Sequence, residues 1–282
     1  MINDVEDCKM DYREVLKNKH RIVVKIGTSS LSYPNGRMNF HSMEKLAYVL
    51  SALRRQDVQV LLVTSGAIGV GSGRLGLTKR PHELPKKQAL AAVGQAELMK
   101  IYQRFFEEYN QIIAQVLLTK DVVEIPSRNQ NARSTLMRLL DMDIIPIINE
   151  NDTIATNEIE FGDNDTLSAI VASLVSADLL IMLSDIDGLY NADPRTKQSA
   201  EIIHSVLEIT PELEKLASGG AGSSFSTGGM VTKISAAKIC LHDGIDCLIA
   251  SGTDPAILFD VLAGKEVGTH FVANAENTHH NG

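Results

Sequence analysis

The sequence contains few cysteines and no long apolar segment. Its three cysteines are odd in number, and Cys8, Cys240 and Cys247 are not spaced like the ligands of a zinc site or a redox pair. We therefore expect free thiols, as in a reducing compartment. No uncharged apolar run approaches the ~20 residues of a membrane-spanning helix, and the charged segment Met1–Lys19 does not resemble a signal peptide. These absences predict a cytoplasmic protein without a membrane partner.

Basic residues are in the minority. The 282 residues include 27 Lys and Arg against 35 Asp and Glu, which gives a formal net charge of −8. Proteins that bind nucleic acids usually present a basic face, so we expect no nucleic-acid partner. This composition does not exclude a small anionic ligand, because a local site can be positive on an acidic protein.

The chain also lacks an internal Pro/Ser-rich linker and a visible repeat, and short apolar runs alternate with longer amphipathic stretches. The runs predict strands at Arg21–Ile26, Val58–Thr64, Ile112–Leu118, Ile144–Ile148, Leu179–Leu183 and Asp246–Ala250. The longer stretches predict helices at His41–Arg54, Lys86–Glu108, Asn129–Leu140, Thr166–Ser176, Gly229–His242 and Pro255–Leu262. This alternation indicates an α/β fold with a mainly parallel sheet covered on both faces.

A single domain accounts for most of the chain. We expect an N-terminal extension at 1–19, one domain at 20–272 and a polar, disordered tail at 273–282. The glycine- and serine-rich stretch Ala217–Gly229 is interpreted as a loop within the domain. Ligands of open α/β sheets bind beyond the carboxyl ends of the strands, so the residues that follow each strand are the candidates for function.

The first predicted strand ends in Lys25-Ile26-Gly27-Thr28-Ser29. A lysine near the end of a buried strand is costly unless its charge has a partner. The residues after it can present backbone N–H groups to an anion. The alternative is that Lys25 lies on an edge strand and reaches water.

Glycines follow the second predicted strand, at Gly66, Gly69, Gly71 and Gly73. Glycines between a strand and a helix allow a ligand to approach the helix N-terminus. Gly71, Gly73 and Gly76 also match the dinucleotide pattern GxGxxG, but they begin several residues past the strand and no strand ending in an acidic residue follows about 20 residues on. The phosphate-binding loop GxxxxGK[ST] is absent. A dinucleotide-binding fold is therefore disfavoured and a P-loop kinase is excluded.

Two polar clusters follow the fourth predicted strand, Asn149-Glu150-Asn151-Asp152 and Gly162-Asp163-Asn164-Asp165. Such residues are often turn residues or helix caps, and we expect Asp163, Asn164 or Asp165 to cap the helix from Thr166. The seven acidic or amide side chains of these two clusters nevertheless exceed what capping requires. Together they suit a ligand that carries both an ammonium and a carboxylate.

Two further segments are suited to a nucleotide. Ser184-Asp185 follows the fifth predicted strand, where the alternative is a plain surface turn. Thr227–Lys233 joins the glycine-rich loop to a predicted helix. A helix N-terminus with a lysine one turn inside it suits a polyphosphate, although a flexible loop with a solvated lysine would have the same sequence.

In this order the segments resemble the amino acid kinase family, and specifically its members that phosphorylate glutamate. The similarity extends from about His20 to His270 and rests on VVKIGTS, VTSGAIG, NEND, GDND, SDIDGLYxADPR and TGGMVTK. It implies an αβα sandwich with about eight strands, and transfer of the γ-phosphoryl group of ATP, with Mg²⁺, to the γ-carboxylate of L-glutamate. It further implies the first step of proline biosynthesis, feedback inhibition by L-proline, and a dimer or tetramer.

The resemblance also implies roles for individual residues. Lys25, Lys233 and Asp165 would be catalytic, with Asp165 also helping to place Mg²⁺. Glutamate would be bound by Ser65, Asn149, Asp152 and Asn164. ATP would be bound by Lys25, Gly27, Ser184, Asp185, Thr227, Gly228, Gly229, Met230, Val231, Thr232 and Lys233.

The sequence departs from the family pattern in two respects. Many of the members that phosphorylate glutamate carry a C-terminal PUA domain, which is not expected here, and Ser184 stands where threonine is frequent. Three alternatives are open: a kinase of the same family that acts on aspartate, N-acetylglutamate, carbamate or UMP, a non-catalytic amino acid sensor, and a dinucleotide oxidoreductase. The NEND and GDND clusters favour a substrate with a free amine.

Overall fold

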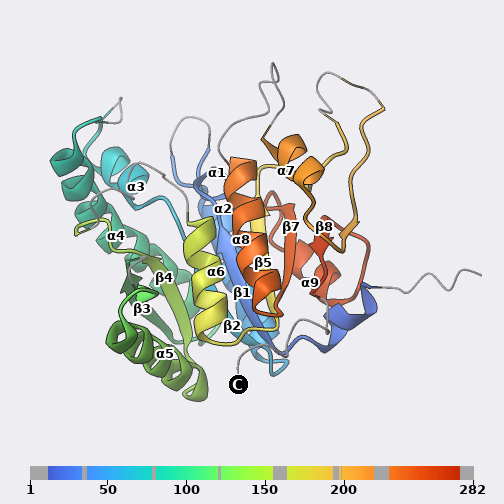
Figure 1. The fold of residues 1–282 in the computed structure, drawn as a ribbon. Helices are drawn as coiled ribbons and strands as arrows, with labels where there is room; N and C mark the ends of the chain where they lie inside the picture. Colours follow the sequence, from blue (N-terminus) through green and yellow to red (C-terminus); the bar gives the residue numbers. More distant parts are fainter. Residues whose placement is uncertain are drawn as a thin grey trace, which may run out of the picture.

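The computed structural model describes residues 12–33, 37–77, 81–119, 122–154, 164–192, 197, 199–218 and 229–273. Within them, one eight-stranded sheet has the order β3-β4-β2-β1-β5-β7-β8-β6 (Figure 1). Only the β7–β8 pair is antiparallel among its strand pairs. The strands are β1 (Arg21–Ile26), β2 (Gln59–Val63), β3 (Ile113–Leu118), β4 (Ile145–Glu150), β5 (Leu179–Ser184), β6 (Ser205–Val206), β7 (Asp246–Ser251) and β8 (Thr269–Phe271).

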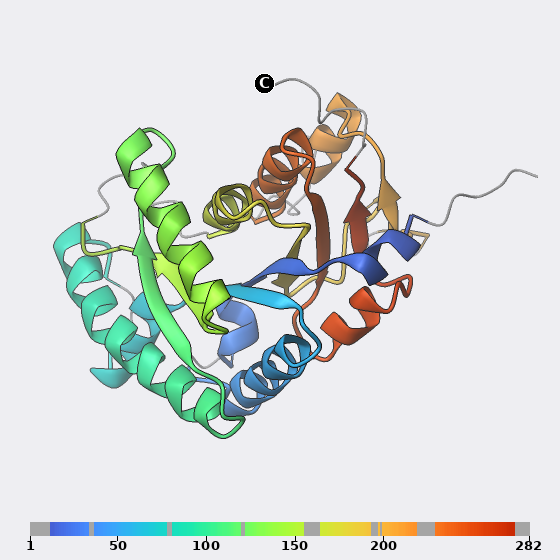
Figure 2. The same ribbon diagram turned by 90° about the horizontal axis from the view of Figure 1, so that it is seen from below.

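Helices cover both faces of this sheet. Figure 2 shows α5, α6 and α8 on one face and α2, α4 and α9 on the other, so the αβα sandwich expected from the sequence is confirmed. The helices are η1 (Glu14–Asn18, a 3-10 helix), α1 (Thr28–Leu31), α2 (Phe40–Arg54), α3 (Ala67–Arg74), α4 (Leu84–Glu107), α5 (Pro126–Asp141), α6 (Asp165–Leu174), α7 (Pro211–Ala217), α8 (Gly229–His242) and α9 (Ile257–Leu262).

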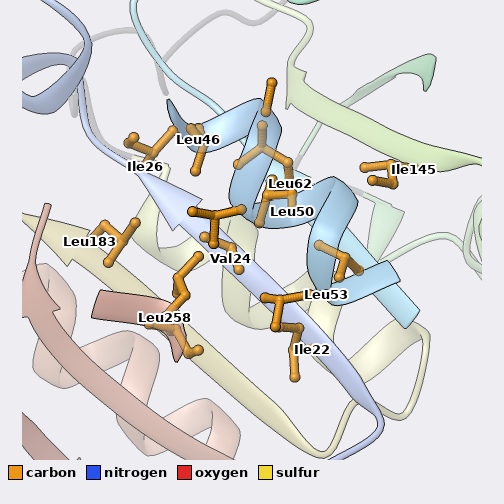
Figure 3. Packing of buried hydrophobic residues seen from close by; sticks show 14 of the residues in the cluster. Ile22, Val24, Ile26, Leu46, Leu50, Leu53, Leu62, Ile145, Leu183 and Leu258 are labelled. Carbon is orange, nitrogen blue, oxygen red and sulfur yellow. The ribbon is translucent and has the colours of Figure 1, made fainter. Parts of the chain in front are cut away.

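The central strand β1 contributes side chains to two separate hydrophobic cores. Val24 packs in the same core as Leu46 and Leu50 of α2 (Figure 3), whereas Val23 belongs to the core beneath α6 and α8. Successive side chains of a strand point to opposite faces, so Lys25 shares the face of Val23. The alternation along β1 thus directs this lysine toward α6 and α8.

All six predicted strands and all six predicted helices are present, with their ends moved by three residues or fewer. The short strands β6 and β8 and the helices α1, α3 and α7 were not predicted. Elements of two to eight residues carry too little apolar periodicity to be detected in the sequence.

Helix α3 replaces what the glycine spacing suggested was a loop. A Cβ atom on Gly94 would lie 1.7 Å from the carbonyl oxygen of Ala67, and one on Gly71 would lie 2.0 Å from that of Leu90. The glycines therefore let α3 and α4 pack backbone to backbone. Gly71 and Gly73 lie inside this helix, so their match to the dinucleotide pattern has a packing explanation.

The N-terminal segment packs beside β6 and β8, at one edge of the sheet. The Arg13 guanidinium donates to the carbonyl oxygens of His204, Val267 and Gly268 at 2.6, 2.6 and 3.1 Å, and Leu16 is fully buried. The domain limits at residues 19 and 272 stay predictions. Within the described part of the chain, no helix combines the length and apolar character needed to cross a membrane.

Candidate active site

Two lysines from separate elements meet on one buried carboxylate. Lys25 Nζ lies 2.6 Å from Oδ1 of Asp165, and Lys233 Nζ lies 2.9 Å from Oδ2. Thr232 also donates its hydroxyl to Oδ2 at 3.0 Å. Asp165 is 0% exposed, and the two lysines are 5% and 6% exposed. Two ammonium groups and one carboxylate leave this group with a net positive charge, which suits a bound anion.

Each member of this group is placed by the local fold. Lys25 is the penultimate residue of β1, Asp165 is the first residue of α6, and Lys233 lies one turn inside α8. Lys233 Nζ also donates to the carbonyl oxygen of Gly229, at 3.2 Å. The edge-strand alternative for Lys25 is wrong, because β1 lies in the middle of the sheet between β2 and β5.

A second polar network lies at the ends of β2 and β4. Asn164 Nδ2 donates to the backbone oxygen of Thr64 at 2.5 Å and to Oδ1 of Asn149 at 2.7 Å. Asn149 Nδ2 in turn donates to Oε1 of Gln95 in α4, at 2.8 Å. The structure therefore brings the predicted substrate residues Asn149 and Asn164 into direct contact.

The helix-cap interpretation, which named Asp163, Asn164 or Asp165, is wrong for Asn164. Asn164 precedes α6 but makes no side-chain cap hydrogen bond, because its amide is directed to the network above. Asp165 faces the lysines instead. Asp163 lies outside the described residues, as does the whole of the connecting segment 155–163.

Ser65 follows β2 and is 9% exposed. The next residue, Gly66, has φ of 100° and turns the chain into α3, a conformation that favours glycine. Beneath Ser65, the hydroxyls of Thr64 and Tyr102 are 2.7 Å apart. Tyr102 is fully buried, and this burial raises the pKa of its phenol.

Asp152 is the partly buried carboxylate at the end of the first polar cluster. Desolvation by burial raises its pKa to about 6. Among the described residues no ion pair involves Asp152, so nothing there offsets the cost of its charge. A cationic ligand group would stabilise the ionised form.

Ser184 and Asp185, two of the residues predicted to bind a nucleotide, lie on the other side of β1, at the end of β5. Ser184 ends β5, and its hydroxyl donates to Oδ1 of Asp185 at 3.0 Å. Gly27 N donates to the carbonyl oxygen of Leu183 at 3.4 Å, which ties the turn after β1 to β5. In α8, Met230 is buried and Val231 is 42% exposed. Thr227 and Gly228, and the predicted motif at 193–195, lie outside the described residues.

The strand order divides the site into two halves. β2 and β4 lie on one side of β1, whereas β5 and β7 lie on the other. The amino acid candidates Ser65 and Asp152 follow strands of the first pair, and Asn149 lies near the end of β4. Ser184 ends a strand of the second pair. Lys25 on β1 stands between the two halves, where a group passing from one ligand to the other would cross.

The described residues contain no cluster of three or more His, Cys, Asp or Glu side chains able to hold a metal ion. Both oxygens of Asp165 already contact ammonium groups.

Comparison with known proteins identifies the family of this chain. The sequence model of the amino acid kinase family matches residues 20–251. The chain belongs to this family. It is 53% identical over 274 residues to "Glutamate 5-kinase" of Listeria innocua, covering 96% of this chain and 99% of that protein. It is 54% identical over 265 residues to the Clostridium perfringens protein of the same name, covering 93% and 98% of the two chains.

Solved structures support the amino acid kinase fold. A UMP kinase from Ureaplasma parvum superposes with a TM-score of 0.62 over 90% of this chain and 99% of that chain, at 16% identity. An isopentenyl phosphate kinase superposes with a TM-score of 0.61 over 90% and 100% of the two chains, at 14% identity. At such low identities the likeness concerns the fold alone.

Two contacts of the site were missed in the sequence. Tyr102 and Gln95 lie on the buried face of α4, two turns apart, and reach Thr64 and Asn149. A glutamine on a helix face otherwise lined by Ala91 and Leu98 was the available signal, since a buried amide requires hydrogen-bond partners.

Proposed function

We propose that this chain transfers the γ-phosphoryl group of ATP to the γ-carboxylate of L-glutamate. Its relatives at 50–54% identity are named glutamate 5-kinase, and that name states the substrate. The observation that carries the proposal is the meeting of Lys25 and Lys233 on Asp165. It places two positive charges at one point between the two halves of the site.

Phosphoryl transfer requires positioning and positive charge more than covalent chemistry from the protein. Charge develops on the oxygens of the transferring group, and preorganised ammonium groups stabilise it in a water-poor site. Lys25 would contact the group from the amino acid side and Lys233 from the nucleotide side. Asp165 would hold both Nζ atoms in place and keep two like charges together.

No general base is required. The nucleophile is a carboxylate with an ordinary pKa of about 4, so it is already ionised near neutral pH. It has only to be aligned with the γ-phosphorus of ATP. The absence of histidine from the described site residues accords with this reaction.

ATP would lie over the carboxyl end of β5 and the start of α8. The amino end of a helix carries partial positive charge and unpaired N–H groups, which suit phosphates. Gly229–Lys233 and, outside the described residues, Thr227 and Gly228 would pass beneath the phosphates, with Gly27 and Ser184-Asp185 nearby. Asp165 would help to place Mg²⁺ bound to the ATP phosphates, and the cation would supply further positive charge to them.

Glutamate would lie over the ends of β2 and β4. The partly buried Asp152 would pair with the α-ammonium group, and Ser65, Asn149 and Asn164 would provide polar contacts. A ligand with one ammonium and two carboxylates fits a site that combines an unpaired carboxylate with amide groups.

Coupled ADP release tests this proposal against its rivals. ATP turnover that depends on L-glutamate is expected. Glutamate binding without turnover would support an amino acid sensor, and NAD(P)H binding would support an oxidoreductase. We also propose a cytoplasmic dimer or tetramer that L-proline inhibits in competition with glutamate, since proline resembles a cyclised glutamate. Inhibition that glutamate does not relieve would place the proline site elsewhere.

A further inference from the structure

Gln95 contributes a buried amide to the substrate side of the site, and half of that amide has no partner. Its side chain lies on α4 and the residue is 8% exposed. Oε1 accepts from Asn149 Nδ2 at 2.8 Å, while the buried Nε2 has no hydrogen-bond partner within the described residues. Buried polar atoms are normally paired, so a glutamine with an unused donor does not suit this position for stability alone.

Two backbone groups fix the direction of every amide in this network. The N–H of Glu150 donates to Asn149 at 2.9 Å, so the accepting atom must be Oδ1. The carbonyl oxygen of Thr64 can only accept, so the atom of Asn164 that faces it must be Nδ2. Asn149 Nδ2 then faces Gln95, so the atom of Gln95 that accepts this hydrogen bond must be Oε1. The orientation of all three amides follows from these two groups and needs no choice between flipped alternatives.

This polarity determines what Asn164 offers to a ligand. Its Nδ2 is used twice, by Thr64 and by Asn149, which leaves Oδ1 as the atom available to a substrate. Oδ1 is an acceptor and suits an ammonium group, but it would repel a carboxylate. The same network therefore favours a substrate with a free amine.

We propose that Gln95 is a positioning residue for substrate recognition. It holds Asn149 by accepting from Nδ2, Asn149 holds Asn164, and Asn164 presents Oδ1 to the α-ammonium group of the substrate. Without an acceptor at position 95, the buried Nδ2 of Asn149 loses its partner and the side chain turns to find another. Asn164 is then no longer held in one orientation.

The helix that carries Gln95 is itself anchored to the same strand ends. Tyr102, two turns further along α4, contacts the Thr64 hydroxyl at 2.7 Å. Thr64 also supplies the carbonyl oxygen that fixes Asn164. One face of α4 thus contacts both Thr64, whose carbonyl oxygen accepts from Asn164, and the amide of Asn149, which is hydrogen-bonded to Asn164.

The test rests on the proposed function and uses Gln95→Met, which keeps the length of the side chain but removes the acceptor. The readout is the ratio of kcat/KM for glutamate to that for glutarate, which keeps both carboxylates and lacks the ammonium. Gln95→Met is expected to lower this ratio by about 10-fold or more, the effect of losing a hydrogen bond to a charged group. The KM for ATP should not change.

Gln103→Met is the matched control. Gln103 lies on the same helix, is exposed, and donates to Glu107 at 2.8 Å, so its ratio should equal that of the wild type. Gln95→Glu keeps an acceptor while removing the unused donor, and it is expected to keep the ratio within about threefold. It also decides the matter if Gln95→Met does not fold.

A double-mutant cycle separates positioning from a general structural effect. If Gln95 acts through Asn164, adding Gln95→Met to Asn164→Ala should lower the ratio no further. Any of three results would overturn the inference. Folded Gln95→Met could keep the wild-type ratio, Gln95→Glu could lower the ratio as Gln95→Met is expected to, or the two effects could multiply in the double variant. A wild-type chain that does not phosphorylate glutamate would instead overturn the proposed function, and this inference with it.

Discussion

Lys25 Nζ lies 2.6 Å from Oδ1 of Asp165, and the other oxygen of the same carboxylate contacts Lys233. Since all three side chains are buried, their charges depend on one another. Two cations share one anion, so the loss of a lysine and the loss of the aspartate have opposite consequences for charge balance. Comparing a lysine variant with an aspartate variant therefore separates effects on catalysis from effects on the free energy of unfolding.

Lys233→Met should abolish most of the activity and leave folding nearly intact. It removes one charge that faces the transferring group, so kcat should fall by ~10²-fold or more. The neutral pair of Lys25 and Asp165 stays behind, so the free energy of unfolding should change little. Steady-state kinetics and urea unfolding check both parts, and near-wild-type turnover would reject the assigned role.

Asp165→Asn should damage both properties. Two buried ammonium groups would be left without a counter-ion, and breaking a buried ion pair in this way typically costs about 3–5 kcal/mol. Asp260→Asn is the control, because its pair with Lys265 at 2.6 Å is exposed and such pairs contribute little. Urea unfolding of the two variants should differ by several kcal/mol, and equal stabilities would contradict the shared-anion account.

Asp152 should make glutamate binding depend on pH. Its pKa is raised to about 6 by burial, so the folded state binds a proton more readily than the unfolded chain. The stabilisation from the protonated form is complete below about pH 4 and is lost as the pH rises through about 6. Protonation also removes the partner of the substrate ammonium, so the KM for glutamate should rise below pH 6.

Asp152→Asn provides the check on this assignment. The variant should be more stable than the wild type at pH 8 by up to roughly 3 kcal/mol, less what solvent screening removes. The two should be equally stable near pH 4, and the variant should bind glutamate weakly at every pH. Thermal unfolding across this range together with the pH profile of KM tests both statements. An unchanged profile in the variant would remove Asp152 from the substrate site.

Gly94→Ala should separate α3 from α4. The added Cβ would lie 1.7 Å from the carbonyl oxygen of Ala67 and 2.5 Å from the nitrogen of Gly71, and overpacking of this kind typically costs 1–3 kcal/mol or more. At Gly76 an added Cβ meets nothing within 4 Å, although φ is 67°, so Gly76→Ala should cost only about 1 kcal/mol. Equal losses in thermal unfolding would contradict the packing explanation.

The sequence was sufficient for the fold class and for the strand ends at which the candidate residues lie. Apolar periodicity identified the strands around Lys25 and Ser184 because each is four to eight residues long and buried. Order along the chain then placed the polar clusters at one edge of the sheet. The sequence did not predict the role of Gln95, whose partner Asn149 is 54 residues away. It also did not predict α3, which packs against Gly94 of α4. Both depend on long-range packing, which no local pattern encodes.

The most direct test of the account is the selectivity measured as kcat/KM for glutamate, aspartate and N-acetylglutamate. Aspartate keeps the ammonium but is one methylene shorter, so its carboxylate falls about 1.5 Å short, an error of alignment that can cost ~10²-fold. N-acetylglutamate leaves the carboxylate of Asp152 without its partner, and sites built to pair with a substrate group reject analogues without it by ~10⁴-fold or more. The account predicts the order glutamate, aspartate, N-acetylglutamate. A preference for N-acetylglutamate would contradict both the role of Asp152 and the proposed reaction.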